Sequence, residues 1–246
     1  PVLVVGADAL RAEVRAVGLR PVTRSEEGPA AVVQGYAAHV GWVDLAEAVL
    51  AVRAGAFWVA TNTDRTLPSP RGPLPGNGAL VAAVRTALDR EPDLVVGKPE
   101  PALFTTAARR FDAERPLVVG DRLDTDIEGA VRAGMDSLLV LTGVSSALDL
   151  LQAPAALRPT YVAFDIGGLF APDRLVRVAD ETGATGADDD WRAVRDGASL
   201  VLTGQGGSLD ALAALCGAAW SGDPVTGVVP GTAGAEAALR ELDLLP

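Results

Sequence analysis

Two short motifs between Val96 and Thr142 organise this chain: Gly97-Lys98-Pro99 and Gly120-Asp121-Arg122-Leu123-Asp124-Thr125-Asp126. Lys98 is the only lysine, since the other twenty of the 21 basic residues are arginines. A compact ammonium group can lie close to a carboxylate and a phosphoryl oxygen together, whereas the guanidinium of arginine is planar and broader. The single lysine therefore suggests a chemical role, and the alternative is a loop residue retained by chance.

The residues around Asp121 predict a strand, a helix and a second strand. Apolar runs at 117–119 and 138–141 flank a segment with helical spacing of apolar residues, and that segment ends at Gly134. The strands of such a unit are parallel, and parallel sheets bind ligands at the carboxyl ends of their strands. Asp121 follows the first apolar run, and Lys98 follows another at 94–96. Both residues are therefore predicted at the ligand-binding edge of a sheet.

The second motif places three carboxylates within six residues. They would repel one another unless a cation lies among them, and a hard divalent ion such as Mg²⁺ prefers oxygen ligands of this kind. Asp124 and Asp126 have an alternative role as acids at a helix N-terminus, and Thr125 or Asp124 is expected to cap that helix. Asp121 ends a strand and has no cap to make, so we predict it as the metal ligand.

These motifs resemble motifs three and four of the haloacid dehalogenase (HAD)-type phosphatases. The resemblance is to the branch with a large α/β cap, which includes phosphoglycolate, pyridoxal phosphate, 4-nitrophenyl phosphate and glycerol 3-phosphate phosphatases. It covers roughly residues 2–169, and the combination of motifs is more specific than any one of them. The residues that carry it are 96–99 and 118–127, with further matches at 34–36, 60–64, 75–78 and 141–144.

The resemblance implies an α/β fold with three parts: a partial, parallel Rossmann-like core, an α/β cap domain and a small α/β C-terminal extension. The expected divisions are a core-to-cap strand at 1–6, the cap at 7–93, the C-terminal half of the core at 94–170 and the extension at 171–246. The extension is acidic, with twelve Asp and Glu residues against five Arg.

The resemblance also implies an activity: Mg²⁺-dependent hydrolysis of a small phosphomonoester, of the glycerol 3-phosphate or phosphoglycolate type, through an aspartyl-phosphate. Lys98 is then catalytic and neutralises the nucleophile and the phosphoryl oxygens. Asp121 is a Mg²⁺ ligand, and Asp126 supports the surroundings of the metal. Asn62 and Arg65, in a loop of the cap, are expected to bind the substrate.

In the family, the nucleophile lies in an N-terminal hydrophobic-Asp-x-Asp-Gly motif, and the sequence from Pro1 onward starts without it. We therefore expect the 246 residues to be the C-terminal part of a longer enzyme and to be inactive alone. The alternative is a non-catalytic module that binds metal or phosphate, or that serves in assembly. Phe164-Asp165-Ile166-Gly167-Gly168 mimics the motif but has glycine at the second aspartate position. We interpret it as a strand that enters a turn.

The composition limits partners and location. The net charge is −11 and the isoelectric point about 4.5, which disfavours nucleic acid and anionic membranes as partners. No apolar run is long enough to span a bilayer. The single cysteine, Cys216, fits a reducing compartment and thus a cytoplasmic location. A small phosphate ester and a second copy, bound through the cap, are the partners that we expect.

Overall fold

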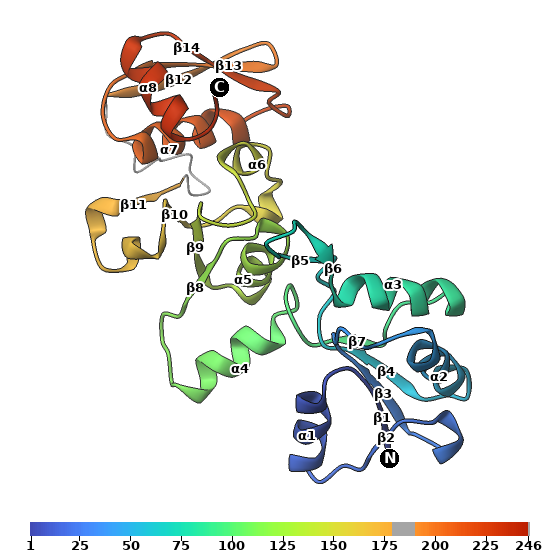
Figure 1. Ribbon diagram of the computed structural model, residues 1–246. Helices are drawn as coiled ribbons and strands as arrows, with labels where there is room; N and C mark the ends of the chain where they lie inside the picture. The colour runs from blue at the N-terminus through green and yellow to red at the C-terminus, as the bar shows by residue number, and fades with distance from the viewer. Residues whose placement is uncertain (179–189, 246) are drawn as a thin grey trace. The chain divides into compact units, whose positions relative to one another are not determined.

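The computed structural model describes residues 1–178 and 190–245, and the chain divides into two compact units, Pro1–Leu103 and Phe104–Pro246 (Figure 1). Each unit contains parallel β-strands covered by helices, so the predicted α/β class is confirmed. Four segments were predicted by their place in the family fold, whereas this division groups residues by their contacts. The boundaries of the four segments stay predictions.

The first unit is built on a parallel sheet with the order β2-β1-β3-β4-β7. Its strands are β1 Val2–Val5, β2 Pro21–Val22, β3 Ala31–Gln34, β4 Phe57–Ala60 and β7 Leu94–Val95. All four residues of β1 are buried, as expected for a strand covered on both faces. Leu3 and Val5 belong to one apolar cluster and Val2 and Val4 to another. The alternation follows from the two-residue period of a strand.

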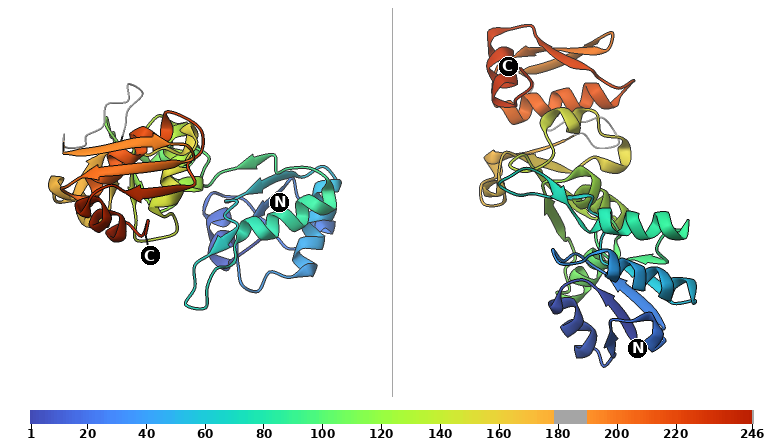
Figure 2. Two further views of the ribbon diagram at one scale, coloured as in Figure 1. Left: turned by 90° about the horizontal axis from the view of Figure 1, so that it is seen from above. Right: turned by 45° about the vertical axis from the view of Figure 1, so that its right-hand side comes forward.

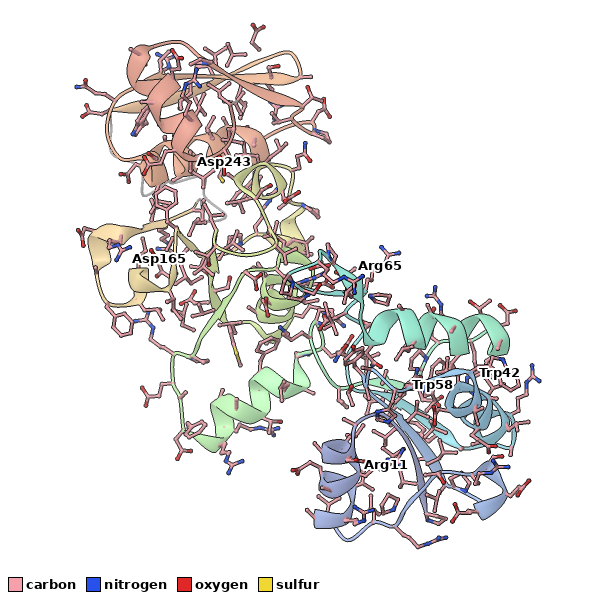
Figure 3. All side chains as sticks on the ribbon, in the orientation of Figure 1. Arg11, Trp42, Trp58, Arg65, Asp165 and Asp243 are labelled. Carbon is pink, nitrogen blue, oxygen red and sulfur yellow. The ribbon has the colours of Figure 1, made fainter. Side chains whose placement is uncertain are left out.

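Helices cover both faces of this sheet (Figure 2). They are α1 Asp8–Ala16, α2 Trp42–Arg53 and α3 Asn77–Leu88. Val14 of α1 packs with Val2 and Val4, whereas α2 and α3 contribute to the cluster around the fully buried Trp58 (Figure 3). A 3₁₀ turn at Ser25–Glu27 and a small hairpin, β5 Thr66–Leu67 with β6 Leu74–Pro75, complete the unit.

The boundary between the units falls inside α4 Ala102–Arg110, so most of this helix belongs to the second unit. The second unit also contains a four-stranded sheet of order β11-β10-β9-β8. The strands β8 Leu117–Gly120, β9 Asp136–Val140 and β10 Tyr161–Ala163 are parallel, and β11 Leu175–Arg177 is antiparallel to β10. The predicted strand–helix–strand unit is confirmed. Its connecting segment has a π-helical turn, Leu123–Ile127, followed by α5 Glu128–Ala133, and Gly134 ends the helix in a left-handed conformation.

The C-terminal part adds the sheet β12-β13-β14 and two helices. Its elements are β12 Trp191–Asp196, β13 Ser199–Gly204, α7 Ser208–Trp220, β14 Gly227–Pro230 and α8 Ala233–Glu241. One apolar cluster runs from Leu123 to Leu242, so this part and the preceding sheet share a core. The strand β11 also joins that sheet, although it lies in the predicted extension.

Short elements join these strands and helices. They are α6 Ala147–Leu151 and 3₁₀ turns at Ala155–Leu157, Ile166–Leu169 and Pro172–Arg174. In the described part of the chain, no helix has both the length and the apolar character needed to cross a bilayer.

Candidate active site

Two loops of the first unit follow the neighbouring parallel strands β4 and β7. The loop after β4 contains Asn62, and the loop after β7 contains Lys98, which is partly buried. A Cβ atom built on Gly97 would lie 2.0 Å from the carbonyl oxygen of Thr61 and 2.9 Å from the Cβ of Asn62. Real atoms cannot approach so closely, so only glycine allows the two loops to pack backbone against backbone. The structure therefore brings together the Lys98 loop and the Asn62 loop.

The loop after β4, which we call the Asn62 loop, comprises residues 61–65. The Oδ1 oxygen of Asn62 accepts a hydrogen bond from the amide of Asp64 at 3.2 Å, which is the turn chemistry typical of asparagine. Asn62 is partly buried, and Arg65 is exposed (Figure 3). Arg65 carries a cation and Asn62 carries amide groups, so the loop presents groups that can bind a phosphate ester.

In the second unit, Asp121 follows β8 and is held by the loop that follows β9. Its Oδ2 oxygen accepts a hydrogen bond from the amide of Val144 at 2.9 Å, and its carbonyl oxygen accepts one from the amide of Ser145 at 3.0 Å. A Cβ built on Gly143 would lie 2.0 Å from Oδ2, in space that the carboxylate occupies. The carboxylate of Asp121 is thus fixed at the carboxyl end of a parallel strand, where the sequence predicted it.

Asp126 is buried, with an exposed fraction of 5%, and lies behind the end of the same strand. Its Oδ2 oxygen accepts a hydrogen bond from the amide of Arg122 at 3.2 Å. A Cβ built on Gly120 would lie 2.5 Å from that oxygen. Asp126 therefore supports the backbone that carries Asp121.

The expected capping by Asp124 or Thr125 is wrong. Asp124 is exposed, and its carboxylate pairs with the guanidinium of Arg122 at 2.7 and 3.0 Å. The Oγ1 atom of Thr125 is buried without a hydrogen-bond partner among the described residues. The π-helical turn explains the difference, because the Arg122 amide at its start is satisfied by Asp126 instead. The pairing with Arg122 also relieves part of the repulsion between the three carboxylates.

Whether this strand end can bind Mg²⁺ depends on the oxygen atoms that it offers as ligands. Asp121 offers a hard carboxylate oxygen from a position that the Val144 amide fixes. Among the described residues, no three His, Cys, Asp or Glu side chains gather closely enough to hold a metal ion together. Asp121 would therefore supply one ligand of a site that needs further oxygen atoms.

The segment that mimics the nucleophile motif has a structural role. Asp165, labelled in Figure 3, accepts a hydrogen bond from the amide of Gly167 at 2.6 Å. It also pairs with Arg174 at 2.7 Å. It follows β10 and caps a 3₁₀ turn, so the predicted strand that enters a turn is confirmed. The other candidate nucleophile by residue type, Cys216, is fully buried, and burial raises the pKa of its thiol.

The residues that support both loops have no role that the sequence alone reveals. The residues that fix the Asp121 carboxylate, Gly143 and Val144, were recognised as a matching motif without a role. Asn77 is buried at the start of α3 and contacts the Asn62 loop. Residues 75–78 were recognised as a family match without a role for Asn77, and the two flanking glycines are a further signal, because glycine often marks close approach of backbones.

Comparisons with known proteins identify the family of the chain. Residues 95–169 match the family model described as HAD-hydrolase-like, and residues 188–244 match that of a GCN5-related N-acetyltransferase-like domain. The structure is similar to the magnesium-bound crystal structure of a glycerol phosphate phosphatase from Mycobacterium tuberculosis, with a TM-score of 0.88 and 47% identity over 99% of this chain and 72% of that one.

The chain belongs to the HAD-like hydrolases. This confirms the family resemblance. The chain is 54% identical over 213 residues to a D-glycerol 3-phosphate phosphatase from Mycobacterium tuberculosis, covering 81% of this chain and 60% of that protein. It is 44% identical over 155 residues to bovine chronophin, covering 59% of this chain and 52% of that protein. This HAD-like chain thus spans between half and two thirds of the length of these curated relatives.

Proposed function

We propose that this chain is part of a Mg²⁺-dependent phosphatase that hydrolyses a small phosphomonoester, of the glycerol 3-phosphate type. The observation that carries the proposal is the carboxylate of Asp121, fixed by the Val144 amide at the end of a parallel strand within the family-matched region. The 54% identity to a D-glycerol 3-phosphate phosphatase favours that ester over phosphoglycolate.

The residues of this chain divide the work of phosphoryl transfer. Asp121 would hold Mg²⁺, which neutralises charge on the phosphoryl oxygens when it is bound. The proposed role of the Lys98 ammonium is to neutralise charge on the phosphoryl oxygens and the nucleophile, because electrostatic stabilisation dominates this kind of transition state. Asp126 keeps the strand end in place. Asn62 and Arg65 would contact the substrate, and the nucleophile of such an enzyme would be the first aspartate of the hydrophobic-Asp-x-Asp-Gly motif.

The test is hydrolysis by a chain extended upstream to include the predicted hydrophobic-Asp-x-Asp-Gly motif. We expect release of inorganic phosphate from glycerol 3-phosphate and from 4-nitrophenyl phosphate, lost on addition of EDTA and restored by Mg²⁺. An extended chain that binds Mg²⁺ but releases no phosphate from either ester would contradict the proposal. That outcome would favour the non-catalytic metal- or phosphate-binding module.

The proposal includes a homodimer and a cytoplasmic location. Three apolar side chains of α2 are largely exposed: Trp42 at 81%, Val43 at 60% and Leu50 at 52%. A second copy would remove them from water, which is favourable for apolar surface. Sedimentation of the wild type and of Trp42→Glu tests this, with a dimer and a monomer as the expected results. The single, buried Cys216 supports a reducing compartment.

A further inference from the structure

A buried asparagine at the start of α3 holds the Asn62 loop. Asn77 has an exposed fraction of 1% and is the first residue of the helix. Its Nδ2 group donates to the carbonyl oxygen of Asn62 at 2.8 Å and to the carbonyl oxygen of Gln34 at 3.4 Å. Gln34 is the last residue of β3, and Asn62 lies just after β4. One side chain therefore joins the ends of two neighbouring strands.

The orientation of this side chain follows from its neighbours. Both atoms that face Nδ2 are carbonyl oxygens, which only accept hydrogen bonds, so the amide must present its NH₂ group to them. The Oδ1 oxygen of Asn77 is then buried without a partner among the described residues. A buried, unpaired acceptor lowers stability. The two donated hydrogen bonds and the unpaired Oδ1 act on stability in opposite directions, and the bond to the Asn62 carbonyl also fixes the position of the Asn62 loop.

The backbone at the start of α3 holds the same loop. The amide of Gly76 donates to the carbonyl oxygen of Arg65 at 3.0 Å, and the amide of Gly78 donates to that of Asp64 at 2.8 Å. A Cβ on Gly76 would lie 2.4 Å from the Asp64 carbonyl oxygen, and one on Gly78 would lie 2.2 Å from that of Thr63. The helix start thus binds the loop carbonyls through the amides of Gly76 and Gly78.

The Asn62 loop is therefore held on two sides. On one side lie Asn77 and the glycines of α3, and on the other lies Gly97 of the Lys98 loop. We propose that Asn77 is a positioning residue for substrate discrimination: it fixes the backbone of residues 61–65 and thereby the side chains of Asn62 and Arg65. This inference rests on the proposed phosphatase function and adds the structural element that sets its selectivity.

The experiment uses two variants and a matched control. Asn77→Ala removes the donor, and Asn77→Asp keeps the shape but turns an oxygen toward two carbonyl oxygens. The control is Thr86→Ala, an exposed residue of the same helix whose hydroxyl donates only to the carbonyl of Ala82. Asn77→Ser, which keeps one donor, replaces any variant that does not fold.

Two readouts separate the inference from the proposed function. Hydrogen exchange on the 246-residue chain should be faster at the amides of Thr61, Asp64 and Gly78 in both Asn77 variants and unchanged in Thr86→Ala. In the upstream-extended chain, the ratio of kcat/KM for glycerol 3-phosphate to that for 4-nitrophenyl phosphate should fall by about fivefold or more. A purely structural role would lower both values equally.

An unchanged ratio in a folded Asn77 variant would overturn the proposal, as would unchanged exchange in the Asn62 loop. Partial recovery of the ratio in Asn77→Ser would support it, because that variant restores a donor. If the extended wild type hydrolyses neither ester, the proposed function fails, and the positioning role is then decided by the exchange rates alone.

Discussion

The Oδ2 oxygen of Asp121 accepts a 2.9 Å hydrogen bond from the amide of Val144, which lies 23 residues further along the chain. This contact joins the ends of the parallel neighbours β8 and β9. A carboxylate held by a backbone amide loses rotational freedom before any ligand arrives. Such preorganisation is what a metal ligand requires, since reorganisation during the reaction would cost rate.

Replacement of Asp121 and of Asp126 should have different effects in the upstream-extended chain. Asp121→Asn removes the charge that binds the metal and should nearly abolish Mg²⁺-dependent activity. Asp126→Asn should weaken activity in a way that additional Mg²⁺ partly restores, because Asp126 supports the strand end instead of binding the ion. Titration of activity with Mg²⁺ distinguishes the two.

A structure with Mg²⁺ bound checks the same assignment without kinetics. An oxygen of Asp121 is expected at about 2.1 Å from the ion. An ion bound to Asp124 and Asp126, with Asp121 turned away, would contradict our interpretation of the whole motif.

Lys98→Arg should lower turnover at least about tenfold with the fold intact, because a guanidinium is too broad for the place of an ammonium beside a phosphoryl oxygen. Steady-state kinetics and a circular dichroism spectrum of the extended chain provide the measurement. Turnover within about a factor of two of the wild type would remove Lys98 from the mechanism.

Gly143→Ala should reduce activity by about a hundredfold, since the new methyl group would displace the Asp121 carboxylate and small displacements of catalytic groups are costly. Gly120→Ala should act similarly through Asp126. The control is Gly227→Ala in β14, where the nearest atom to an added Cβ, the Oγ of Ser199, is 3.9 Å away. Equal activity of the Gly143 and Gly227 variants would show that the position of Asp121 is not critical.

The 246-residue chain alone should have no phosphatase activity, because it holds no nucleophile motif and Asp165 is bonded to Gly167 and Arg174. Incubation of the purified chain with 4-nitrophenyl phosphate and Mg²⁺ tests this. Hydrolysis that disappears in Asp165→Asn would overturn the prediction and make Asp165 the nucleophile.

Acid should weaken the first unit through Glu47. This buried residue of α2 accepts a hydrogen bond from the amide of Ser25 at 2.7 Å, and that bond, aided by Arg24, lowers the pKa of its carboxyl below the ordinary 4.5. The ionised form therefore adds stability above pH 4.5, and this stability is lost as the pH falls through the lowered pKa.

Glu47→Gln should cost about 1 kcal/mol or more of unfolding free energy at neutral pH, and the difference should shrink in acid. Urea unfolding of the 246-residue chain at several pH values measures it. The exposed Glu13→Gln on α1 is the control. A difference that stays constant with pH would show that Glu47 contributes no ionisation-linked stability.

Much of the framework was predictable from local pattern. The runs at 2–5, 117–119 and 138–141 are apolar and short, and helical periodicity separates the last two. These features predicted parallel strands and placed Lys98 and Asp121 at strand ends.

Some local features depend on residues that are distant in the sequence, so local pattern does not predict them. A serine at a helix start often caps it, but Gly207 occupies the capping position of α7, and the Ser208 hydroxyl is hydrogen-bonded to Glu241. The short strands β2, β11 and β12 were not predicted, since their pairing partners rather than their own residues make them strands. Residues 183–190 are polar and rich in glycine and aspartate, which predicts a turn, but all except Asp190 lie outside the described part of the chain.

The sequence by itself determined which residues end strands, because apolar periodicity and glycine positions act over a few neighbouring residues. Only the tertiary structure decided what holds those residues. The amide of Val144 reaches Asp121, Asp126 fills the space beside Gly120, and Asn77 reaches the Asn62 carbonyl. These contacts join loops that follow neighbouring strands, and the identity of the neighbours is fixed by the packing of the whole sheet.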